Sequence, residues 1–295
     1  VPIAWLEGLH EPIGRIGIHA YLLEALRAYT TGGIDAGAHP PVATAIAKYH
    51  ATEMFRRVIN DAMDVQGGAA IVKGPRNLLA GPYQGTPIII TVEGANIMTR
   101  TLIQFGQGLF RCHPYAFKVV DAIRENRLSA FDRYFWRHAL HGAANALRAL
   151  LLTLTRGRLL VHLGFGRDRA FLKKLSWASA VFATLSEAAL VMVGGGLKRR
   201  GMLSGRYGDM LSWLYLGAAL ARRWRAEPRK KELAPAYEGA AALCLSGLSS
   251  AAEGITLELG GPLWQATLGR MGAWLLRMNR FGNPPTDRTL SRVTR

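Results

Sequence analysis

One stretch of the sequence places a single carboxylate among apolar side chains. Glu93 lies in TPIIITVEGANIMTR, after a run of isoleucines and a valine and directly before Gly94. A carboxylate that apolar neighbours keep from water is a stronger base than an exposed one, and such a base can remove a proton from carbon. The pattern is also typical of an acid at a helix start, which complements the helix dipole. The residues alone leave both interpretations open.

Other chemistry-bearing residues lack the neighbours that their chemistry needs. His138 and His141 are three apart, a spacing that metal sites use, but no third ligand is evident, so we expect a structural or exposed pair and no metal site. GFGRDRA has Arg169 where a dinucleotide-binding loop needs glycine or alanine. Ser204 and Ser246 lie in no G-x-S-x-G motif. The sequence therefore predicts neither a metalloenzyme, a dinucleotide loop nor a serine hydrolase.

Apolar residues recur mainly at helical spacing and rarely alternate, so the sequence predicts an all-α fold. Two long helices are expected over 13–33 and 39–68, each ending in a glycine pair. Residues 74–87 are rich in glycine and proline and predict a loop, and 283–295 are expected to be disordered. Further helices are expected over 95–111, 128–156, 168–195, 205–226, 233–258 and 262–280.

Basic residues are concentrated in the later part of the chain. Through Lys118 there are 10 Lys and Arg against 8 Asp and Glu, and after it 27 against 12. This change, together with the break at CHPY, predicts one domain over 1–118 and a basic helical domain of unknown role over 119–295. Such a segment attracts anionic lipid, nucleic acid or phosphorylated ligands. No nucleic-acid motif accompanies the charge, so no nucleic-acid partner is expected.

Cysteine content and hydropathy indicate the compartment. Only Cys112 and Cys244 are present, which fits a reducing cytoplasm without a disulfide. The longest apolar stretch begins at Trp177 but contains Glu187 and three glycines, so we expect a buried helix rather than a membrane span. The chain starts at Val1 without a signal peptide, and we expect a piece of a longer cytoplasmic protein. Any membrane contact is expected to be peripheral, on the inner face of the cell membrane.

Two motifs together resemble a known family. VQGGAAI and, twenty-odd residues later, TVEGANI resemble the C-terminal helical domain of flavin-dependent acyl-CoA dehydrogenases, in which a double glycine ends one long helix and E-G-T-N begins a later one. NIMTRTLIQFGQGLFRCHPYAF, AIAKYH, INDAMD and LKRRGMLSGRYGDMLSWLYL resemble the long bacterial members that act in fatty-acid β-oxidation. The resemblance covers nearly the whole chain and is strongest from Ala45 to Tyr115.

The resemblance implies a C-terminal helix bundle followed by a second helical domain, and it implies a reaction. In that reaction a glutamate, here Glu93, removes the pro-R α-proton of a fatty acyl-CoA thioester. The β-hydrogen leaves as hydride to FAD, and the product is the trans-2-enoyl-CoA. The resemblance also implies an electron-transfer flavoprotein as electron acceptor and a homodimer or larger assembly.

The same resemblance implies cofactor-binding residues. Gly67 and Gly68 match the turn that approaches the adenine dinucleotide part of FAD, often that of the neighbouring subunit. Gly94 would let substrate and flavin approach the backbone closely. Ala95 would offer only backbone N–H groups, and Asn96 is a further candidate.

The chain also departs from the family pattern. Val92 stands where the family usually has tyrosine, Ala95 where it has threonine, and Asp64 where it often has glutamine. No β-rich segment is present, so the chain alone is expected to bind FAD weakly or not at all and to be inactive. The alternative is a non-catalytic basic helical module that binds a membrane surface or nucleic acid, with Glu93 as a capping acid.

Overall fold

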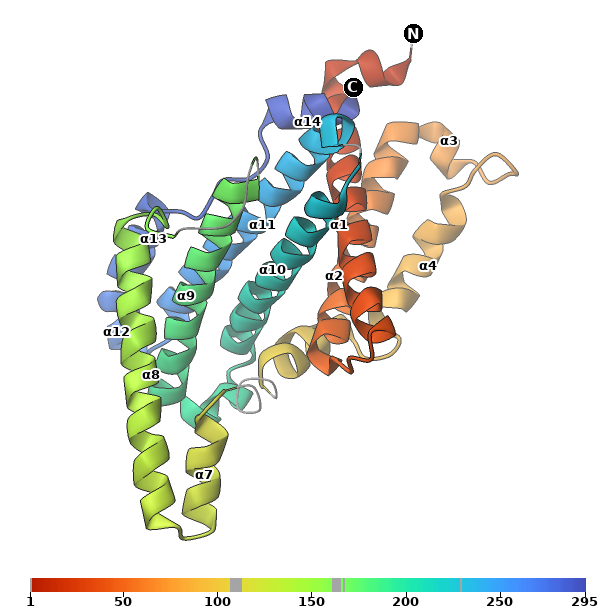
Figure 1. The fold of residues 1–295 in the computed structure, drawn as a ribbon. Helices are drawn as coiled ribbons and strands as arrows, with labels where there is room; N and C mark the ends of the chain where they lie inside the picture. Colours follow the sequence, from red (N-terminus) through yellow and green to blue (C-terminus); the bar gives the residue numbers. More distant parts are fainter. Residues whose placement is uncertain (1, 107–112, 161–165, 167, 229) are drawn as a thin grey trace. The chain divides into compact units, whose positions relative to one another are not determined.

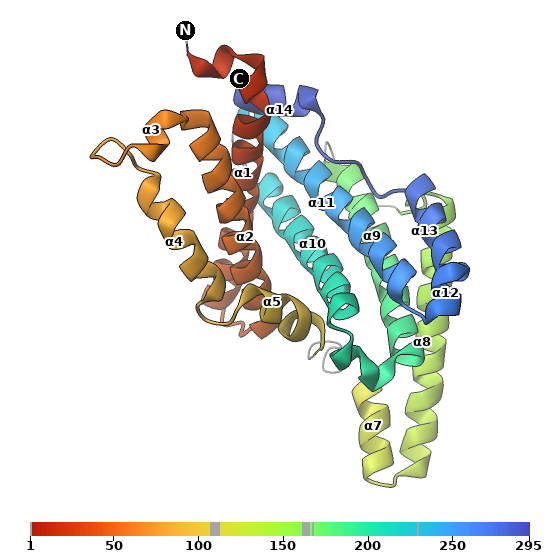
Figure 2. The same ribbon diagram turned by 180° about the vertical axis from the view of Figure 1, so that it is seen from behind.

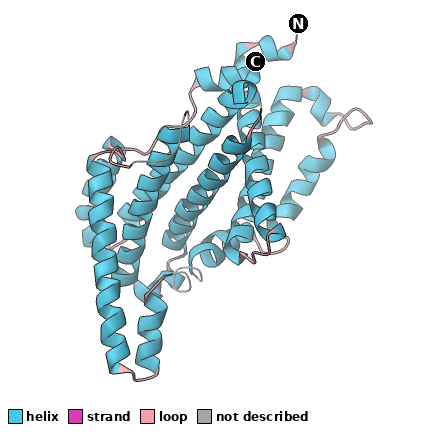
Figure 3. Ribbon diagram, viewed as in Figure 1, coloured by secondary structure: helices cyan, strands magenta, loops and turns pink. Residues whose placement is uncertain are grey.

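The computed structural model describes residues 2–106, 113–160, 166, 168–228 and 230–295. Within these residues every regular element is a helix and no strand occurs (Figures 1 and 3). The predicted all-α fold is therefore confirmed.

The chain forms two compact units. Unit 1 comprises Val1–Thr99, Tyr215–Ser246 and Gly282–Arg295, and unit 2 comprises Arg100–Leu214 and Gly247–Phe281. Two long helices, α10 (Gly201–Ala226) and α11 (Lys230–Glu258), contribute residues to both units. Because the units are not consecutive stretches, they do not test a domain boundary near residue 118, which stays a prediction.

Unit 1 is built around α1 (His10–Asp35) and α2 (Pro41–Gln66), which lie side by side (Figures 1 and 2). Pro41 occupies the first turn of α2, where a missing N–H costs nothing. Apolar side chains of the two helices are almost completely buried, among them Ile18, Leu22, Leu26 and Ile46. Both long helices predicted from the sequence are confirmed.

The C-terminal segment forms α14 (Asp287–Thr294), so the prediction of disorder over 283–295 is wrong. Thr286 caps the helix, because its hydroxyl accepts a hydrogen bond of 3.4 Å from the Thr289 N–H. Leu290 is buried against α1 at Gly14. Ser291 and Thr294 add hydrogen bonds of 3.0 and 3.2 Å to His10, so a buried leucine, a cap and polar contacts together order this mostly polar segment.

The prediction of a loop over 74–87 is wrong for its second half, because α4 (Ala80–Thr91) begins there. This helix lies beside α2 (Figure 2). Asn77 begins the helix, because its side-chain oxygen accepts hydrogen bonds of 2.9 Å from the N–H groups of Leu79 and Ala80. Pro82 falls in the first turn, where proline is tolerated, while Pro87 lies inside the helix. The short α3 (Gly68–Ile71) precedes this segment.

Unit 2 contains α7 (Ala116–Arg124), α8 (Leu128–Leu154), α9 (Asp168–Met192), η4 (Gly194–Arg199), α12 (Pro262–Ala266) and α13 (Leu268–Met278). Trp177 of α9 anchors the packing: its indole N–H donates to the Thr153 hydroxyl at 3.0 Å, and its ring lies 4.6 Å from that of Phe281. The sequence missed α7. It also predicted one helix over 262–280, where the structure has two that meet at Thr267.

Among the described residues, two helices are long and apolar enough to cross a membrane by length and composition alone. These are Asp168–Met192, with 28% of its most apolar window buried, and Lys231–Glu258, with 50%. Core helices meet the same criteria, so the expected absence of a membrane span stays a prediction. Cys244 is fully buried, and Cys112 lies outside the described residues, as does part of the GFGRDRA motif.

Candidate functional site

A turn of unusual backbone geometry holds Glu93. After α4 ends at Thr91, Glu93 has φ +56° and Gly94 has φ +99° before α5 (Asn96–Met98) and the π-helix η3 (Thr99–Gly106) begin. Left-handed backbone is ordinary for glycine but uncommon for glutamate. Residues in such conformations concentrate at functional sites, where their surroundings hold them.

Side chains of α2 fix this turn. The Lys48 ammonium donates hydrogen bonds of 2.8 Å to the Gly94 carbonyl and to the side-chain oxygen of Asn96. The Asn96 amide nitrogen donates to the hydroxyl of Thr52 at 2.9 Å and to a carboxylate oxygen of Glu53 at 2.8 Å. Asn96 is 6% exposed, so these bonds form where water does not compete for them.

The hydrogen-bonding groups of Asn96 are therefore turned onto α2. Both N–H groups of its amide have partners, and its oxygen accepts from Lys48. In this chain Asn96 positions the turn that carries Glu93, and its predicted contact with a cofactor stays a prediction. No local sequence pattern predicts this anchor, because more than forty residues separate Asn96 from its partners on α2.

The chain itself does not shield Glu93 from water. Glu93 is exposed, and Ile88 and Val92 are 65% and 51% exposed. The poorly solvated setting that the sequence suggested is thus not supplied by the described residues. The exposed apolar side chains around the turn, which include Ile97 at 79%, instead offer a surface that another group could cover.

The glycine pair lies at the opposite end of α2 from the Glu93 turn. From Lys48 to Gly67 the helix rises roughly 28 Å, at about 1.5 Å per residue, so the structure does not bring the two predicted sites together. Gly67 has φ +56° and ends α2 with a hydrogen bond of 2.9 Å from its N–H to the Met63 carbonyl. A Cβ at Gly68 would meet no described atom within 4 Å. Nothing in the described chain therefore explains a glycine at position 68.

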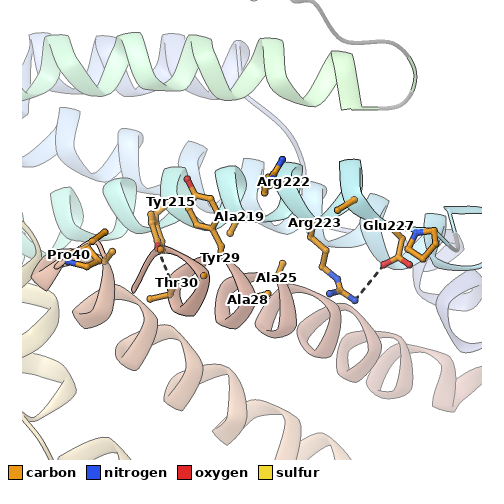
Figure 4. A pocket seen from close by; sticks show the side chains of 16 residues that line it. Ala25, Ala28, Tyr29, Thr30, Pro40, Tyr215, Ala219, Arg222, Arg223 and Glu227 are labelled. Atoms are coloured by element: carbon orange, nitrogen blue, oxygen red, sulfur yellow. Dashed lines mark hydrogen bonds and ion pairs between the residues drawn. The ribbon is translucent and has the colours of Figure 1, made fainter. Parts of the chain in front are cut away.

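Unit 1 also holds a cavity of about 840 Å³ between α1, the start of α2 and α10 (Figure 4). Alanine and glycine form much of its wall, and a hydrogen bond of 3.0 Å joins the hydroxyls of Thr30 and Tyr215 beside it. At its other end Arg223 pairs with Glu227 at 3.5 Å. Glu93 does not line this cavity, so the cavity is not a substrate pocket for that carboxylate.

A second polar cluster, in unit 2, joins α8, α9 and the start of α7. Glu187 accepts hydrogen bonds of 2.8 Å from Nε2 of His113 and from Nε2 of His138, and Nε2 of His141 lies 4.0 Å away. Burial acts to raise the pKa of the Glu187 carboxyl, but the two histidine hydrogen bonds outweigh it and lower that pKa. The sequence analysis did not predict this cluster, because Glu187 is 74 residues from His113 and 49 residues from His138 along the chain.

The ligand atoms of His113, His138 and Glu187 lie within 4.8 Å of one another, close enough to share a metal ion. However, Nδ1 of His113 accepts the N–H groups of Tyr115 at 3.1 Å and Ala116 at 2.8 Å. The ring proton of His113 must then sit on Nε2, which leaves no lone pair there for a metal. The arrangement favours a hydrogen-bonded cluster over a metal centre.

Fold and site together define an all-helical protein that presents a carboxylate on a strained, side-chain-anchored turn. The chain belongs to the acyl-CoA dehydrogenase family. Residues 2–106 match the model described as "Acyl-CoA dehydrogenase, C-terminal domain", and residues 110–295 match "Acyl-CoA dehydrogenase, C-terminal, bacterial type".

A solved structure from Bacillus anthracis, an acyl-CoA dehydrogenase complexed with FAD, is similar in fold. The TM-score is 0.71 at 14% sequence identity, over 99% of this chain and 48% of that one. This chain therefore spans about half the length of that protein. The resemblance read from the VQGGAAI and TVEGANI motifs is confirmed at the level of the family.

Proposed function

We propose that the chain is the C-terminal part of an FAD-dependent dehydrogenase that converts a fatty acyl-CoA to the trans-2-enoyl-CoA in β-oxidation. The observation that carries this proposal is the Glu93 turn, where a carboxylate has left-handed backbone geometry and hydrogen bonds to α2 fix the residues that follow it. Membership of the acyl-CoA dehydrogenase family supports the reaction type.

In the proposed reaction Glu93 acts as general base. A carboxylate oxygen of Glu93 takes the α-proton of the thioester, and the Lys48 and Asn96 hydrogen bonds limit the movement of the turn. A base held at a fixed distance from carbon avoids much of the entropy cost of proton transfer. When FAD is bound, it supplies the acceptor for the β-hydrogen, which leaves as hydride.

The residues present fit such a cofactor at two places. The open space at the Cα of Gly68 would admit part of an adenine dinucleotide next to the backbone, and Gly67 supplies the backbone turn beside it. At the other end of α2, the exposed apolar side chains around Glu93 would be covered by substrate, by flavin or by protein that this chain lacks. Such a covering would exclude water from the carboxylate, as a carbon base requires.

The test is Glu93→Gln in the full-length protein. Glutamine keeps the size and polarity of the side chain but cannot take the proton, so turnover should fall by about 10²–10⁴-fold. FAD content should stay at the wild-type level. If Glu93 only caps a helix, the variant will keep its turnover and change only in stability.

Two further partners belong to this proposal. An electron-transfer flavoprotein would reoxidise the reduced cofactor, and Gly67 and Gly68 at the far end of α2 would face the FAD of a second subunit in a homodimer or larger assembly. The distance along α2 between Gly67 and the Glu93 turn supports the second subunit as a partner. A single FAD would otherwise have to reach both ends of α2.

A membrane-facing role for unit 2 is supported by a specific surface. On α13 the exposed apolar residues Leu268, Met271, Trp274, Leu275 and Met278 fall on one face at helical spacing. The segment between Glu258 and Asp287 contains Arg270, Arg277 and Arg280 and no acidic residue, so it is positively charged.

The neighbouring α8 has the same character. Trp136, Leu140, Leu147 and Leu154 are between 59% and 73% exposed, and Asp132 is the sole acid between Glu125 and Asp168. The Asn279 side chain, just after α13, donates a hydrogen bond of 2.8 Å to the Thr153 carbonyl near the end of α8. An apolar helix face flanked by arginine suits the interface of an anionic bilayer, on the cytoplasmic face of the cell membrane.

Flotation with liposomes tests this role. Wild-type protein should float with vesicles that contain anionic lipid, and less with neutral vesicles or at high salt. Trp274→Ser should reduce flotation, whereas Trp5→Ser, which changes an exposed tryptophan of unit 1, should not. No flotation with anionic vesicles would remove the membrane role and leave a second copy or another domain as the partner of this face.

A further inference from the structure

A second cavity of unit 1 has one polar wall and one apolar wall. It encloses about 420 Å³ between α1, α2, α11 and the segment that leads into α14. The apolar wall consists of Ile18, Leu243, Pro284, Pro285 and Leu290, and the polar wall consists of Glu11, Arg15, His19, Arg57, Asn60 and Asp61. Glu93 and the glycine pair take no part in it, so it is independent of the proposed dehydrogenase site.

His19 is an unsatisfied polar group in this wall. The side chain is 5% exposed, and its Nδ1 is buried without a hydrogen-bond partner among the described residues. A buried polar atom without a partner costs free energy, so its presence asks for an explanation such as a ligand.

Arg57 supplies an available positive charge. It is exposed on α2 and forms no ion pair or hydrogen bond with the described residues, although it lines the cavity. The two acids of the wall are instead both paired with Arg15. Its guanidinium donates to Asp61 at 2.7 and 3.1 Å and also to Glu11. Arg15 thereby neutralises the wall's negative charge in part and leaves Arg57 free for a ligand.

The positive charges of Arg57 and Arg15 also act on the imidazole of His19. The pKa of His19 is lowered to about 4, mainly by burial and also by the positive charges of Arg57 and Arg15, while Asp61 acts in the opposite direction. Because Asp61 and Glu11 are both paired with Arg15, Arg57 is the charged group of the wall that is left to attract an anion. His19 is then neutral at pH 7, and a neutral imidazole can donate one N–H.

We propose that this cavity binds a small organic anion. Arg57 and the Nδ1–H of His19 would hold a carboxylate or phosphate group by charge-assisted hydrogen bonds, and the wall formed by Ile18, Leu243 and the two prolines would hold an apolar body. A cavity of about 420 Å³ lies within the usual range for small-molecule sites.

Hexanoate and hexyl phosphate are suitable probes, since they share an apolar chain and differ in the anionic group. Each is titrated into the full-length protein by calorimetry, with the His19 ring resonance followed by NMR. Hexanol, which lacks the charge, serves as the neutral reference. The variants are Arg57→Gln and, as matched control, Arg56→Gln, which removes an adjacent arginine that faces Glu53 at 3.6 Å. Both side chains are exposed, so both variants should fold.

We expect saturable binding of at least one of the two anions, with a shift of the His19 resonance. Arg57→Gln should weaken that binding by about tenfold or more, and Arg56→Gln by less than about twofold. The anion that binds more tightly identifies the natural head group as carboxylate or phosphate. The proposal is overturned if neither anion binds, if hexanol binds as well as they do, or if Arg57→Gln binds like the wild type.

Discussion

Asn96 shows how a buried side chain can hold in place the turn that carries the proposed base, Glu93. Its side chain joins the start of α5 to three residues of α2, in a position that is 6% exposed. Because Glu93 lies three residues earlier in an uncommon backbone conformation, these bonds help to hold the turn that carries its carboxylate. Asn96 is therefore a positioning residue in the proposed enzyme.

Asn96→Ala should destabilise unit 1. The variant leaves the Lys48 ammonium, the Thr52 hydroxyl and the Glu53 carboxylate without the partner that Asn96 provides, which costs about 1–3 kcal/mol. Urea unfolding measures the change. Asn60→Ala is the control and should change stability by less than about 0.5 kcal/mol, because Asn60 is exposed on α2 and its amide donates to the Arg56 carbonyl of the same helix. Equal effects of the two changes would contradict the anchoring role of Asn96.

At this scale the role of Glu93 as the base stays a prediction, and the poorly solvated setting predicted for it is not found among the described residues. The E-G pair in the sequence predicts a functional role for Glu93 and Gly94. The φ of +99° at position 94 is one that glycine adopts readily. The exposure of Glu93 was not predictable, because the isoleucines before it belong to α4 and partly face solvent. The role of Asn96 depends on its contacts with α2, which is distant in the sequence. A local sequence pattern therefore cannot predict it.

At the scale of elements, α14 and α1 pack unusually closely. A Cβ on Gly14 would lie 2.8–2.9 Å from the backbone and Cβ of Leu290, closer than real side chains approach. Glycine at this position is thus required by the neighbouring helix and not by its own backbone conformation. The order of the C-terminal segment depends on this contact.

Gly14→Ala should therefore destabilise the protein and loosen α14. Overpacking of this kind costs about 1–3 kcal/mol, measurable by urea unfolding and by faster proteolysis of residues 283–295. Gly32→Ala in the same helix is the control: a Cβ there meets nothing within 4 Å. The better helix propensity of alanine should leave that variant as stable as the wild type or more so by about 0.5–1 kcal/mol. A stable, protease-resistant Gly14→Ala would contradict the packing.

Glu187 holds three elements of unit 2 together through His113 and His138. Its lowered pKa means that the folded state binds the proton less readily than the unfolded chain. This stabilisation is therefore complete above the ordinary carboxyl pKa of about 4.5 and is lost as the pH falls through the lowered value.

Glu187→Gln should cost about 1.5–3 kcal/mol at pH 7, because an amide offers one acceptor oxygen to two histidine donors. The difference from the wild type should shrink as the pH falls below about 4.5. Glu125→Gln, which removes an exposed pair with Arg127, is the control and should cost about 0–1 kcal/mol. A loss of stability that does not depend on pH would contradict this role of the carboxylate.

Long periodic helices were predictable from the sequence and short or unusual ones were not. The apolar repeats of α1, α2, α8, α9 and α11 extend over many turns, so their period is clear. In α4 the prolines and glycines resemble a loop, yet Asn77 starts a helix and α2 covers one side of it. In α14 the one buried residue is Leu290, which is too little for a periodic pattern, and polar contacts such as Ser291 to His10 supply the rest.

At the scale of the whole molecule, the chain has the exposed surfaces expected of part of a larger assembly. It matches two C-terminal models of the acyl-CoA dehydrogenase family and covers 48% of a solved member. The exposed apolar residues beside Glu93 and on α8 and α13 belong to separate units. The proposals above assign a different partner to each: substrate, flavin or protein at the Glu93 turn, and an anionic membrane at α8 and α13.

The most direct test of the central claim is exchange of the α-protons of an acyl-CoA that carries no β-hydrogen, such as 3,3-dimethylbutanoyl-CoA, in D₂O with the FAD-loaded full-length protein. Such a substrate separates proton removal from hydride loss. The account predicts deuterium at the α-carbon with the wild type and an exchange rate lower by about 10²–10⁴-fold with Glu93→Gln. Exchange at the wild-type rate in Glu93→Gln would show that another group is the base.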